Sequence, residues 1–350
     1  MEHTQAKSKP VILITGGSGL IGKRLIERFA DRYQCIGLDK AGNERPNPKA
    51  ENISFDITDR ASIRAALERV RHAYGDRIAS VIHLAAYYDF AGEPSDLYDK
   101  VTVRGTENFI KALQPFNVDQ FIFSSTNLVY KPSEPGEKID EDWPLDASWD
   151  YPESKVKTEK ILREQHGDIP IVILRLAGVY DEEGHSIPLT HQIQRIYENN
   201  LTGHFYPGDL LNGNAFVHLE DLDQAFIQTV EKRYELPHEL TLNISESKTY
   251  SYEELQDFIG ERIHHKEWKT FEIPKPLAKV GAWAQDLVSD PFIKPWMIDR
   301  ADDNYEMDIT RAKEYLDWEP KHDLMSTLPE MIDRLKADPD RWYKVNELDA

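Results

Sequence analysis

Short apolar runs alternate with amphipathic stretches along the first half of the chain. The apolar runs are rich in β-branched residues, as buried strands are, and the stretches between them repeat their apolar positions at helical spacing. Strands are therefore expected at residues 11–14, 34–38, 53–55, 78–84, 119–124 and 169–174. Helices are expected at about 20–30, 60–74, 96–114 and 152–166. Strands that alternate with helices predict a doubly wound α/β fold, in which a parallel sheet is covered on both faces.

The alternation weakens after about residue 178, which indicates a second structural portion. Pro188 and Pro207 interrupt the pattern, and the tail from Ser251 is largely helical. We expect a flexible N-terminus at residues 1–9. A nucleotide-binding domain is expected at residues 10–178, with a returning segment at about 213–245. A smaller, mostly helical substrate-binding portion is expected at residues 179–212 and 246–350. Substrates often bind at the interface between two such portions.

Charge and composition narrow the class of protein. The 350 residues carry a formal net charge of −20, and an acidic protein repels the phosphates of a nucleic acid. Cys35 is the only cysteine, which rules out an internal disulfide or a thiolate metal cluster. The histidines show no metal-ligand spacing, so we expect no metal. The N-terminus is polar and no apolar run is long enough for a membrane span, so we expect a cytoplasmic protein without a transmembrane segment.

A glycine-punctuated turn follows the first expected strand. Gly16, Gly19 and Gly22 stand three apart, between the apolar run that begins at Val11 and a helical stretch. In such turns the first glycine permits a tight bend, the second lets the backbone approach a pyrophosphate, and the third lets the helix pack on the strand. The helix N-terminus then offers free N–H groups to phosphates. The pattern is typical of a Rossmann-type dinucleotide site, although by itself it also fits an ordinary strand-to-helix turn.

Asp39 ends the second expected strand, where the adenosine ribose of a dinucleotide lies in such folds. A carboxylate there accepts hydrogen bonds from the ribose hydroxyls and repels a 2′-phosphate, which favours NAD over NADP as the cofactor. Lys40 follows directly, and a basic neighbour can bind a 2′-phosphate, so some NADP use stays open.

Tyr151 and Lys155 lie four residues apart in an expected helix, so their side chains share one face. A nearby cation favours tyrosinate, and we expect Lys155 to lower the pKa of Tyr151 towards that of a general base. Such pairs are common on exposed helices, but the expected strand before this helix ends in Ser124, Ser125 and Thr126. Parallel α/β sheets bind their ligands at the carboxyl ends of strands. The sequence therefore predicts an acid–base site there.

Together these motifs resemble the extended short-chain dehydrogenase/reductase family, also called the NAD-dependent epimerase/dehydratase family. The resemblance runs from about residue 10 to residue 320. It rests on Thr15–Gly22, Asp39, Asp56–Ile57, His83–Ala86, Gly105–Thr106, Ser124–Thr126, Tyr151 with Lys155, Arg175 and Phe216–Asp221. It implies hydride transfer between NAD and a substrate carbon, with the protein supplying placement and electrostatics.

The resemblance also implies roles for individual residues. Tyr151 would be the catalytic acid or base, Thr126 would orient the substrate oxygen, and Lys155 would tune the tyrosine and hold the nicotinamide ribose. The implied cofactor contacts are Gly16, Gly19, Leu20, Ile21, Gly22, Asp39, Asp56, Ile57, Leu84, Ala85, Ala86, Tyr151, Lys155, Leu176 and Val179. The implied substrate contacts are Tyr87, Asn127 and Leu128.

Departures from the family pattern narrow the expected substrate. Asn127 and Leu128 stand where nucleotide-sugar dehydratases carry an acidic residue that protonates the leaving hydroxyl. Gly178 and Asn214 stand where sugar-nucleotide epimerases typically carry an asparagine and an arginine for the diphosphate side. Arg300 matches a second diphosphate-binding arginine, so the pattern is mixed and leans against a nucleotide sugar.

Two other segments, Ala177–Tyr180 and Tyr87–Phe90, are more similar to the hydroxysteroid-dehydrogenase branch. We therefore expect an NAD-dependent oxidoreductase that acts on a secondary alcohol or ketone of a small, non-nucleotide substrate. The alternatives are an NAD-dependent nucleotide-sugar epimerase and an NAD-sensing binding protein without turnover. The family often dimerises through the helix that carries Tyr151 and Lys155, which makes a homodimer a further expectation.

Overall fold

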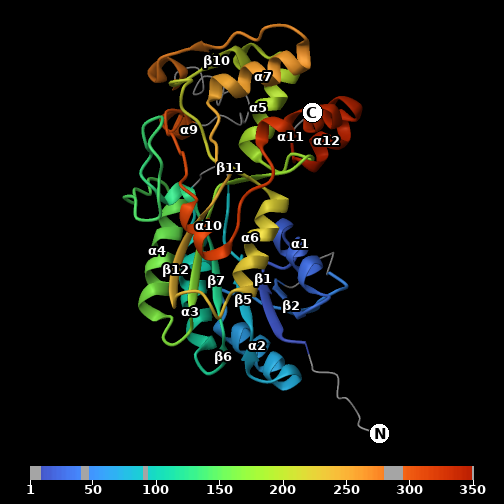
Figure 1. Ribbon diagram of the computed structural model, residues 1–350, viewed down its shortest axis with the longest axis vertical. Helices are drawn as coiled ribbons and strands as arrows, with labels where there is room; N and C mark the ends of the chain where they lie inside the picture. Colours follow the sequence, from blue (N-terminus) through green and yellow to red (C-terminus); the bar gives the residue numbers. More distant parts are fainter. Residues whose placement is uncertain (1–8, 41–46, 90–93, 280–294, 349–350) are drawn as a thin grey trace.

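The computed structural model describes residues 9–40, 47–89, 94–279 and 295–348. Figure 1 shows an elongated molecule with a helix-covered sheet at one end and a mainly helical portion at the other. The sheet has the strand order β12-β8-β7-β5-β1-β2-β3. Its strands are β1 (Val11–Thr15), β2 (Gln34–Asp39), β3 (Glu51–Ser54), β5 (Ser80–His83), β7 (Phe121–Thr126), β8 (Ile171–Leu176) and β12 (Glu239–Ile244).

Every pairing in this sheet is parallel. The chain moves outward from β1 through β2 to β3, then returns to the other side of β1 with β5. The strand order therefore reverses between β1 and β5, and open α/β sheets bind their ligands beyond the carboxyl ends of the strands at such a switch point. The predicted Rossmann-type fold is confirmed.

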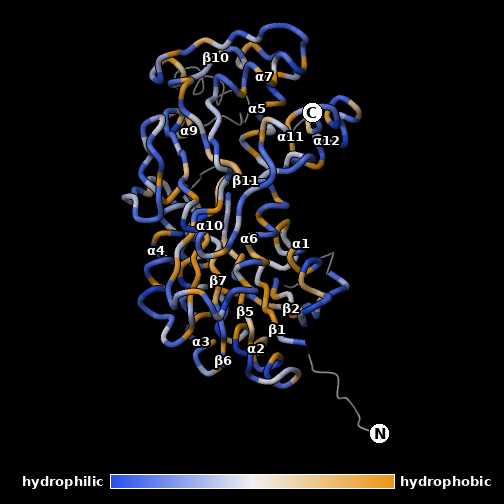
Figure 2. Tube along the Cα trace, in the orientation of Figure 1, coloured by the Kyte–Doolittle hydropathy of each residue, from blue (hydrophilic) through white to orange (hydrophobic). Residues whose placement is uncertain are grey.

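Helices cover both faces of the sheet, and the strands between them are the most apolar part of the chain (Figure 2). One face is covered by α2 (Arg60–Tyr74), α3 (Arg104–Leu113) and α4 (Asp150–Gln165). The other face is covered by α1 (Leu20–Phe29), α6 (Leu219–Glu231) and α10 (Thr310–Leu316). Apart from the edge strand β3, the strands are largely buried on both sides, which explains why they read as continuous apolar runs and not as alternating patterns.

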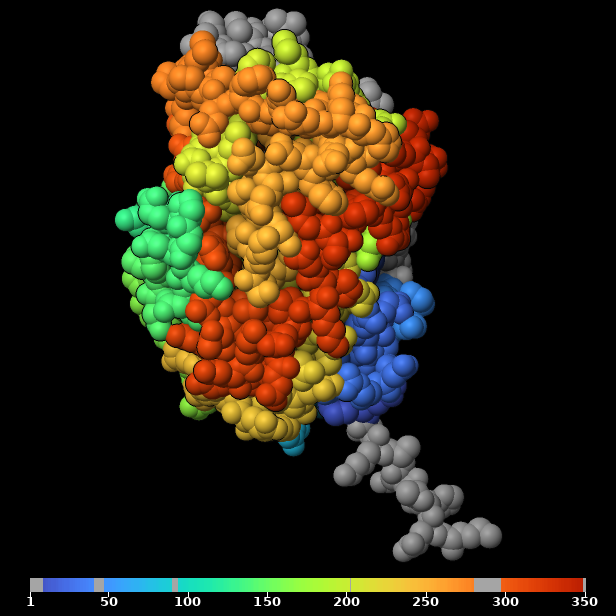
Figure 3. All heavy atoms as spheres, turned by 45° about the horizontal axis from the view of Figure 1, so that its top comes forward, coloured from blue at the N-terminus to red at the C-terminus, as the bar shows by residue number. Residues whose placement is uncertain are grey.

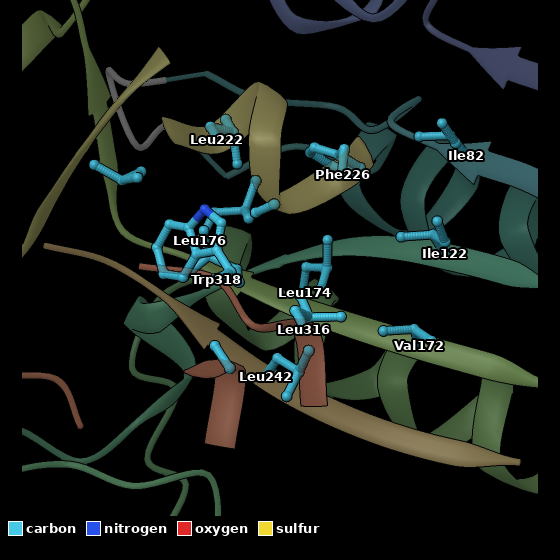
Figure 4. Packing of buried hydrophobic residues seen from close by; sticks show 14 of the residues in the cluster. Ile82, Ile122, Val172, Leu174, Leu176, Leu222, Phe226, Leu242, Leu316 and Trp318 are labelled. Carbon is cyan, nitrogen blue, oxygen red and sulfur yellow. The ribbon is translucent and has the colours of Figure 1, made fainter. Parts of the chain in front are cut away.

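Figure 4 shows the core beneath α6 and α10. Val172 and Leu174 of β8 pack there with Phe226 of α6 and Leu316 of α10, and all are buried. Trp318 closes this core, and its indole N–H donates to the Asp221 carbonyl over 2.9 Å. Burying one such apolar side chain contributes about 1.5–3 kcal/mol, so this core holds the C-terminal segment on the sheet.

The second portion has a separate core, formed mainly by four helices. These are α5 (Ile187–Tyr197), α7 (Tyr252–His264), α11 (Leu324–Ala337) and α12 (Pro339–Val345). A capping box begins α7, because Ser251 and Glu254 each accept a hydrogen bond from the other's backbone N–H. Figure 3 shows residues after 300 (red) lying against both portions, beside α6 and β12 (yellow) and beside α7 (orange).

The remaining elements are short. They are the strands β4 (Arg77–Ile78), β6 (Asn117–Val118), β9 (Gly178–Tyr180), β10 (Phe205–Tyr206), β11 (Phe216–His218) and β13 (Phe271–Glu272), the helix α9 (Pro295–Asp299), and the helical turns η1 (Tyr98–Val103), η2 (Asn127–Val129) and η3 (Leu201–His204). Two pairings, β9 with β11 and β10 with β13, connect distant parts of the second half. No helix among the described residues is long and apolar enough to cross a membrane.

The expected strands and helices of the first half are all present, within a few residues of their predicted ends. One helix differs, because the stretch expected at 96–114 begins as the π-helical turn η1 before α3. The Thr102 carbonyl accepts hydrogen bonds from the hydroxyls of Thr106 and Thr158, which compete with regular helical bonds. The expected domain boundaries stay a prediction.

Candidate active site

The glycine turn brings the start of α1 against the end of β1. Gly16 has φ +70°, in the left-handed region that favours glycine, and its carbonyl accepts the Gly19 N–H over 3.0 Å. A Cβ atom at Gly22 would lie 2.2 Å from the Gly16 carbonyl oxygen. The turn is therefore a tight backbone cradle that only glycine fits, at the switch point of the sheet, and its shape suits a dinucleotide pyrophosphate.

Replacing Gly22 with alanine should weaken NAD binding by more than tenfold. The added methyl forces the turn to open, and overpacking of this kind costs about 1–3 kcal/mol, where 1.4 kcal/mol is tenfold in affinity. Titration calorimetry with NAD measures the effect. Gly75→Ala is the control, because Gly75 also has a positive φ but no atom lies within 4 Å of its added Cβ. Equal NAD affinity in the Gly22→Ala variant and the wild type would contradict the assignment of the cradle.

Asp39 is held beside this cradle. One carboxylate oxygen accepts hydrogen bonds from the Ser18 N–H, over 2.9 Å, and from the Ser18 hydroxyl. The other oxygen accepts the Lys40 N–H over 2.8 Å. The carboxylate is thus fixed at the end of β2, within the same loop cluster as the glycines, where the sequence predicts it.

The extended segment after β5 alternates its side chains between two environments. Leu84, Ala86 and Tyr88 line a cavity, whereas Ala85 and Tyr87 pack into the core under α3. Successive side chains of an extended segment point to opposite sides. The structure therefore corrects one predicted substrate contact, because the Tyr87 ring packs on Tyr98 with centroids 4.8 Å apart and its neighbour Tyr88 faces the cavity.

Tyr151, Lys155 and Thr126 meet in this cavity, as the sequence predicts. Tyr151 and Thr126 both line this cavity, and the Tyr88 ring lies 4.9 Å from that of Tyr151. The Lys155 ammonium donates to the Ser124 carbonyl over 2.8 Å and lies 5.7 Å from the centre of the Tyr151 ring. A proton-transfer group and two donors thus lie together at the carboxyl end of β7.

The ionisation of this group differs from the expectation. Burial raises the pKa of Tyr151 to about 12, and the Thr126 hydrogen bond opposes the rise only in part. Burial lowers the pKa of Lys155 to about 7, although the negative charge of Glu159 opposes that. The predicted lowering of the Tyr151 pKa by Lys155 is therefore absent, because desolvation dominates at both groups. A raised pKa keeps Tyr151 protonated near neutral pH, the form that a proton donor needs.

A buried ion pair supports the helix that carries Tyr151 and Lys155. Glu159 follows them at the same spacing on α4, and Arg175 of β8 donates to it twice, over 2.6 and 3.0 Å. Ser125 of β7 donates to the same carboxylate over 2.6 Å. Sequence reasoning placed Arg175 in a motif without a partner. The spacing of 151, 155 and 159 along one helix face was the signal that would have found Glu159.

The cavity has a volume of about 410 Å³ and lies between the two portions. Five residues expected to contact cofactor or substrate line it besides those above, namely Ile21, Asn127, Leu128, Leu176 and Val179. The lining residues that sequence reasoning missed are His185, Ser186, Ile187, Pro188, Ala215 and Phe216, together with Asn214, which was noted only as a departure. They come from the second half of the chain, where no sequence periodicity indicated which side faces the sheet.

The other predicted cofactor contacts lie away from this cavity. The Asp56 carboxylate accepts the Thr58 N–H and hydroxyl over 2.9 and 2.7 Å, which lowers the pKa of Asp56. Ile57 is buried against Gly105, and Leu20 is 41% exposed. Phe90 lies outside the described residues. Among the described residues no cluster of histidine, cysteine and acidic side chains is arranged to hold a metal ion.

The fold and this site together define the class of dinucleotide-dependent α/β enzymes. The sequence profile of the NAD dependent epimerase/dehydratase family matches residues 12–245. The chain belongs to this family, and it is an NAD-dependent enzyme. Membership of this family supports an enzyme over the second alternative, a binding protein without turnover.

Named relatives carry out more than one reaction. The chain is 28% identical over 280 residues to a putative UDP-glucose 4-epimerase of Methanocaldococcus jannaschii, which covers 76% of this chain and 86% of the relative. It is 25% identical over 205 residues to a 3-beta-hydroxysteroid dehydrogenase of Mycolicibacterium neoaurum, covering 55% and 52%. The crystal structure of UDP-glucuronic acid 4-epimerase from Bacillus cereus with UDP-glucuronic acid and NAD has a TM-score of 0.70 at 21% identity, covering 93% and 99%.

Proposed function

We propose that this protein is an NAD-dependent epimerase of a nucleotide sugar. This is the alternative named from the sequence, and it replaces the non-nucleotide substrate as the first choice. The relatives that match along most of their length support it, since UDP-glucose 4-epimerases are prominent among them. The observation that carries the proposal is the hydroxyl pair of Tyr151 and Thr126, which faces a cavity between the two portions.

The proposed reaction removes hydrogen from one secondary alcohol carbon and returns it to the other face of the same carbon. Bound NAD supplies the hydride acceptor and donor. Burial keeps Tyr151 protonated near neutral pH, so Tyr151 must first lose its own proton. The tyrosinate then takes the hydroxyl proton in the first half-reaction and returns it in the second, while Thr126 orients the oxygen by a hydrogen bond. Lys155 lies one helical turn from Tyr151, where its ammonium can hold the nicotinamide ribose hydroxyls. The product is an isomer, so no net NADH forms.

For the cofactor we propose the contacts implied by the family resemblance. The glycines of the turn bind the pyrophosphate, and Asp39 accepts the adenosine ribose hydroxyls. Asp56 and Ile57 lie at the adenine end, and Leu176 and Val179 lie along the nicotinamide. The cytoplasmic location and the homodimer stay predictions.

The test is an assay of the purified protein with UDP-glucose or UDP-galactose. An epimerase converts either sugar into a mixture of the two, as chromatography of the released sugars shows, while the absorbance of NADH stays flat. Absence of isomerisation with these sugars, with their uronic acids and with their N-acetylated forms would reject the proposal.

The second candidate function is that of a dehydrogenase of an uncharged alcohol, and one observation supports it. The cavity walls are mainly apolar, and Gly178 and Asn214, which line it, offer no positive charge. Such an enzyme should release NADH in proportion to product when incubated with NAD and an apolar secondary alcohol. The two candidates are thus separated by one absorbance measurement.

A further inference from the structure

Arg195, in the second portion of the protein, has no ion-pair partner among the residues that the structure describes. Its Nε atom is buried and makes no hydrogen bond, and no ion pair or hydrogen bond of its guanidinium occurs in the described part of the chain. Each of the other partly or fully buried arginines among the described residues donates to a carboxylate or a carbonyl group. A buried charge normally has a partner, because desolvation without one is costly. Arg195 is partly buried and is not paired with an anion among the described residues, so a negatively charged group from outside the protein can pair with it.

The position of Arg195 on α5 relates it to the active-site cavity. Ile187 and Pro188, at the start of α5, line the cavity. Arg195 lies on the face of Pro188, two turns further along, whereas Leu189, Ile193 and Ile196 face the core against α7. At 1.5 Å per residue, the guanidinium is attached about 10 Å along the helix from the cavity wall. Figure 1 shows α5 beside α7 in the upper portion of the molecule.

A row of polar groups connects Arg195 to the cavity. Arg195 interacts electrostatically with Tyr206, whose ring centre lies 4.7 Å from that of Tyr252. The Tyr252 hydroxyl accepts a hydrogen bond from the Asn214 amide over 2.5 Å, and Asn214 lines the cavity. Burial raises the pKa of both tyrosines, so these groups are neutral hydroxyls and do not neutralise the arginine. The row can donate hydrogen bonds, but the only positive charge in it is that of Arg195.

We infer that Arg195 binds the diphosphate of the substrate. The inference rests on the proposed function, because a nucleotide sugar carries its diphosphate several ångströms from the reacting sugar carbon. Asn214 stands where sugar-nucleotide epimerases typically carry an arginine, and its amide donates to the Tyr252 hydroxyl. The positive charge for the diphosphate comes instead from Arg195 on α5. Arg300 already donates to Asp303, over 3.4 Å. Arg195 thus sets the specificity for a charged substrate without touching the reacting carbon.

The experiment compares the binding of UDP and uridine to the NAD-loaded protein by titration calorimetry. The Arg195→Gln variant should bind UDP about 10- to 100-fold more weakly, the size expected for losing a charge-assisted hydrogen bond, and should bind uridine as the wild type does. The UDP affinity of Arg195→Lys should lie between those of the wild type and Arg195→Gln, since lysine keeps the charge but loses the two-pronged geometry of the guanidinium. Arg262→Gln is the matched control, because Arg262 is a partly buried arginine of the same portion that pairs with Asp333.

A second readout distinguishes ligand binding from a structural role. An arginine with no bound anion destabilises the ligand-free protein, so Arg195→Gln should melt at the same temperature as the wild type or higher. A lower melting temperature with unchanged UDP affinity would overturn the inference, as would a wild type that binds no UDP. Epimerisation by Arg195→Gln with an unchanged KM would overturn the inference and leave the proposed function standing. If UDP binding depended on Arg195 but no nucleotide sugar were turned over, the proposed function would fall and the inference about Arg195 would stand.

Discussion

Replacing Tyr151 with phenylalanine should lower kcat by about 100- to 10,000-fold, the usual contribution of one general acid–base group. The substitution removes a single oxygen. The ring keeps its packing against Tyr88 and Trp149, whose centres lie 4.9 and 5.5 Å away, so the fold has no reason to change. The loss should fall on the chemical step because the remaining Thr126 hydroxyl can hold the substrate oxygen but cannot replace the proton carrier.

Steady-state kinetics with the nucleotide sugar and calorimetry with NAD test this together. The dissociation constant of NAD should change by no more than a few-fold, because the cradle and Asp39 are untouched. Tyr98→Phe is the control, since it removes the hydroxyl of a nearby buried tyrosine that donates to the Asp89 carbonyl over 3.1 Å, outside the cavity. If Tyr151→Phe kept more than a tenth of the wild-type kcat, Tyr151 would not be the proton carrier.

Replacing Arg175 with methionine should lower the free energy of unfolding by about 3–5 kcal/mol, the cost of leaving one partner of a buried ion pair alone. Glu159 is fully buried, and Arg175 is 3% exposed. The pair joins α4 to β8, and Ser125 of β7 donates to the same carboxylate. The variant should therefore lose stability, and the position of Tyr151 and Lys155 on α4 should loosen with it.

Urea unfolding of the variant against the wild type measures this loss. Arg163→Met is the matched control, because Arg163 contacts the same carboxylate over 3.3 Å with a side chain that is 36% exposed. Surface ion pairs contribute about 1 kcal/mol or less. A loss below 1 kcal/mol in Arg175→Met would show that the pair does not hold α4 in place.

The pH dependence of the Arg175→Met variant has a definite sign. In the wild type, burial raises the pKa of Glu159, but the bonds and charge of Arg175 outweigh it, and the pKa lies below its ordinary value. The stabilising contribution is therefore complete above the unfolded-state pKa of Glu159 and is lost as the pH falls through the folded-state pKa. Without Arg175, burial raises the pKa of Glu159 against only the Ser125 hydrogen bond and the Arg163 charge, so the folded variant favours the neutral acid more than the wild type does. The stability gap between the two proteins should narrow as the pH falls towards about 4.5.

The family and its cofactor could be predicted from the sequence because they depend on local features. Gly22 is specified by a contact with Gly16, six residues away, and Tyr151 and Lys155 share a face through helix geometry alone. Asp39 ends a strand whose apolar pattern is continuous. These interactions join residues that are close in the sequence. The cradle, the acidic strand end and the tyrosine–lysine pair therefore appear where they were predicted.

The pKa of Tyr151 could not be predicted in this way. The spacing of Tyr151 and Lys155 indicated attraction between two charges, but the degree of burial decides whether those charges exist. Part of that burial comes from the ring of Tyr88, which approaches from a distant part of the sequence. The environment of Tyr87 could not be predicted either. In the extended segment after β5, neighbouring side chains point to opposite sides, so Tyr87 packs into the core while Tyr88 faces the cavity.

By itself the sequence determined the fold class, the family, the use of NAD and the residues at the carboxyl ends of β1, β2 and β7, since each depends on short-range patterns. Only the tertiary structure decided what surrounds them. It closed the cavity with the start of α5 and the segment around Asn214, paired Glu159 with Arg175, and gave Arg195 no ion-pair partner among the described residues. The reason is that desolvation and ion pairing depend on which distant surfaces meet, and no periodicity along the chain records that.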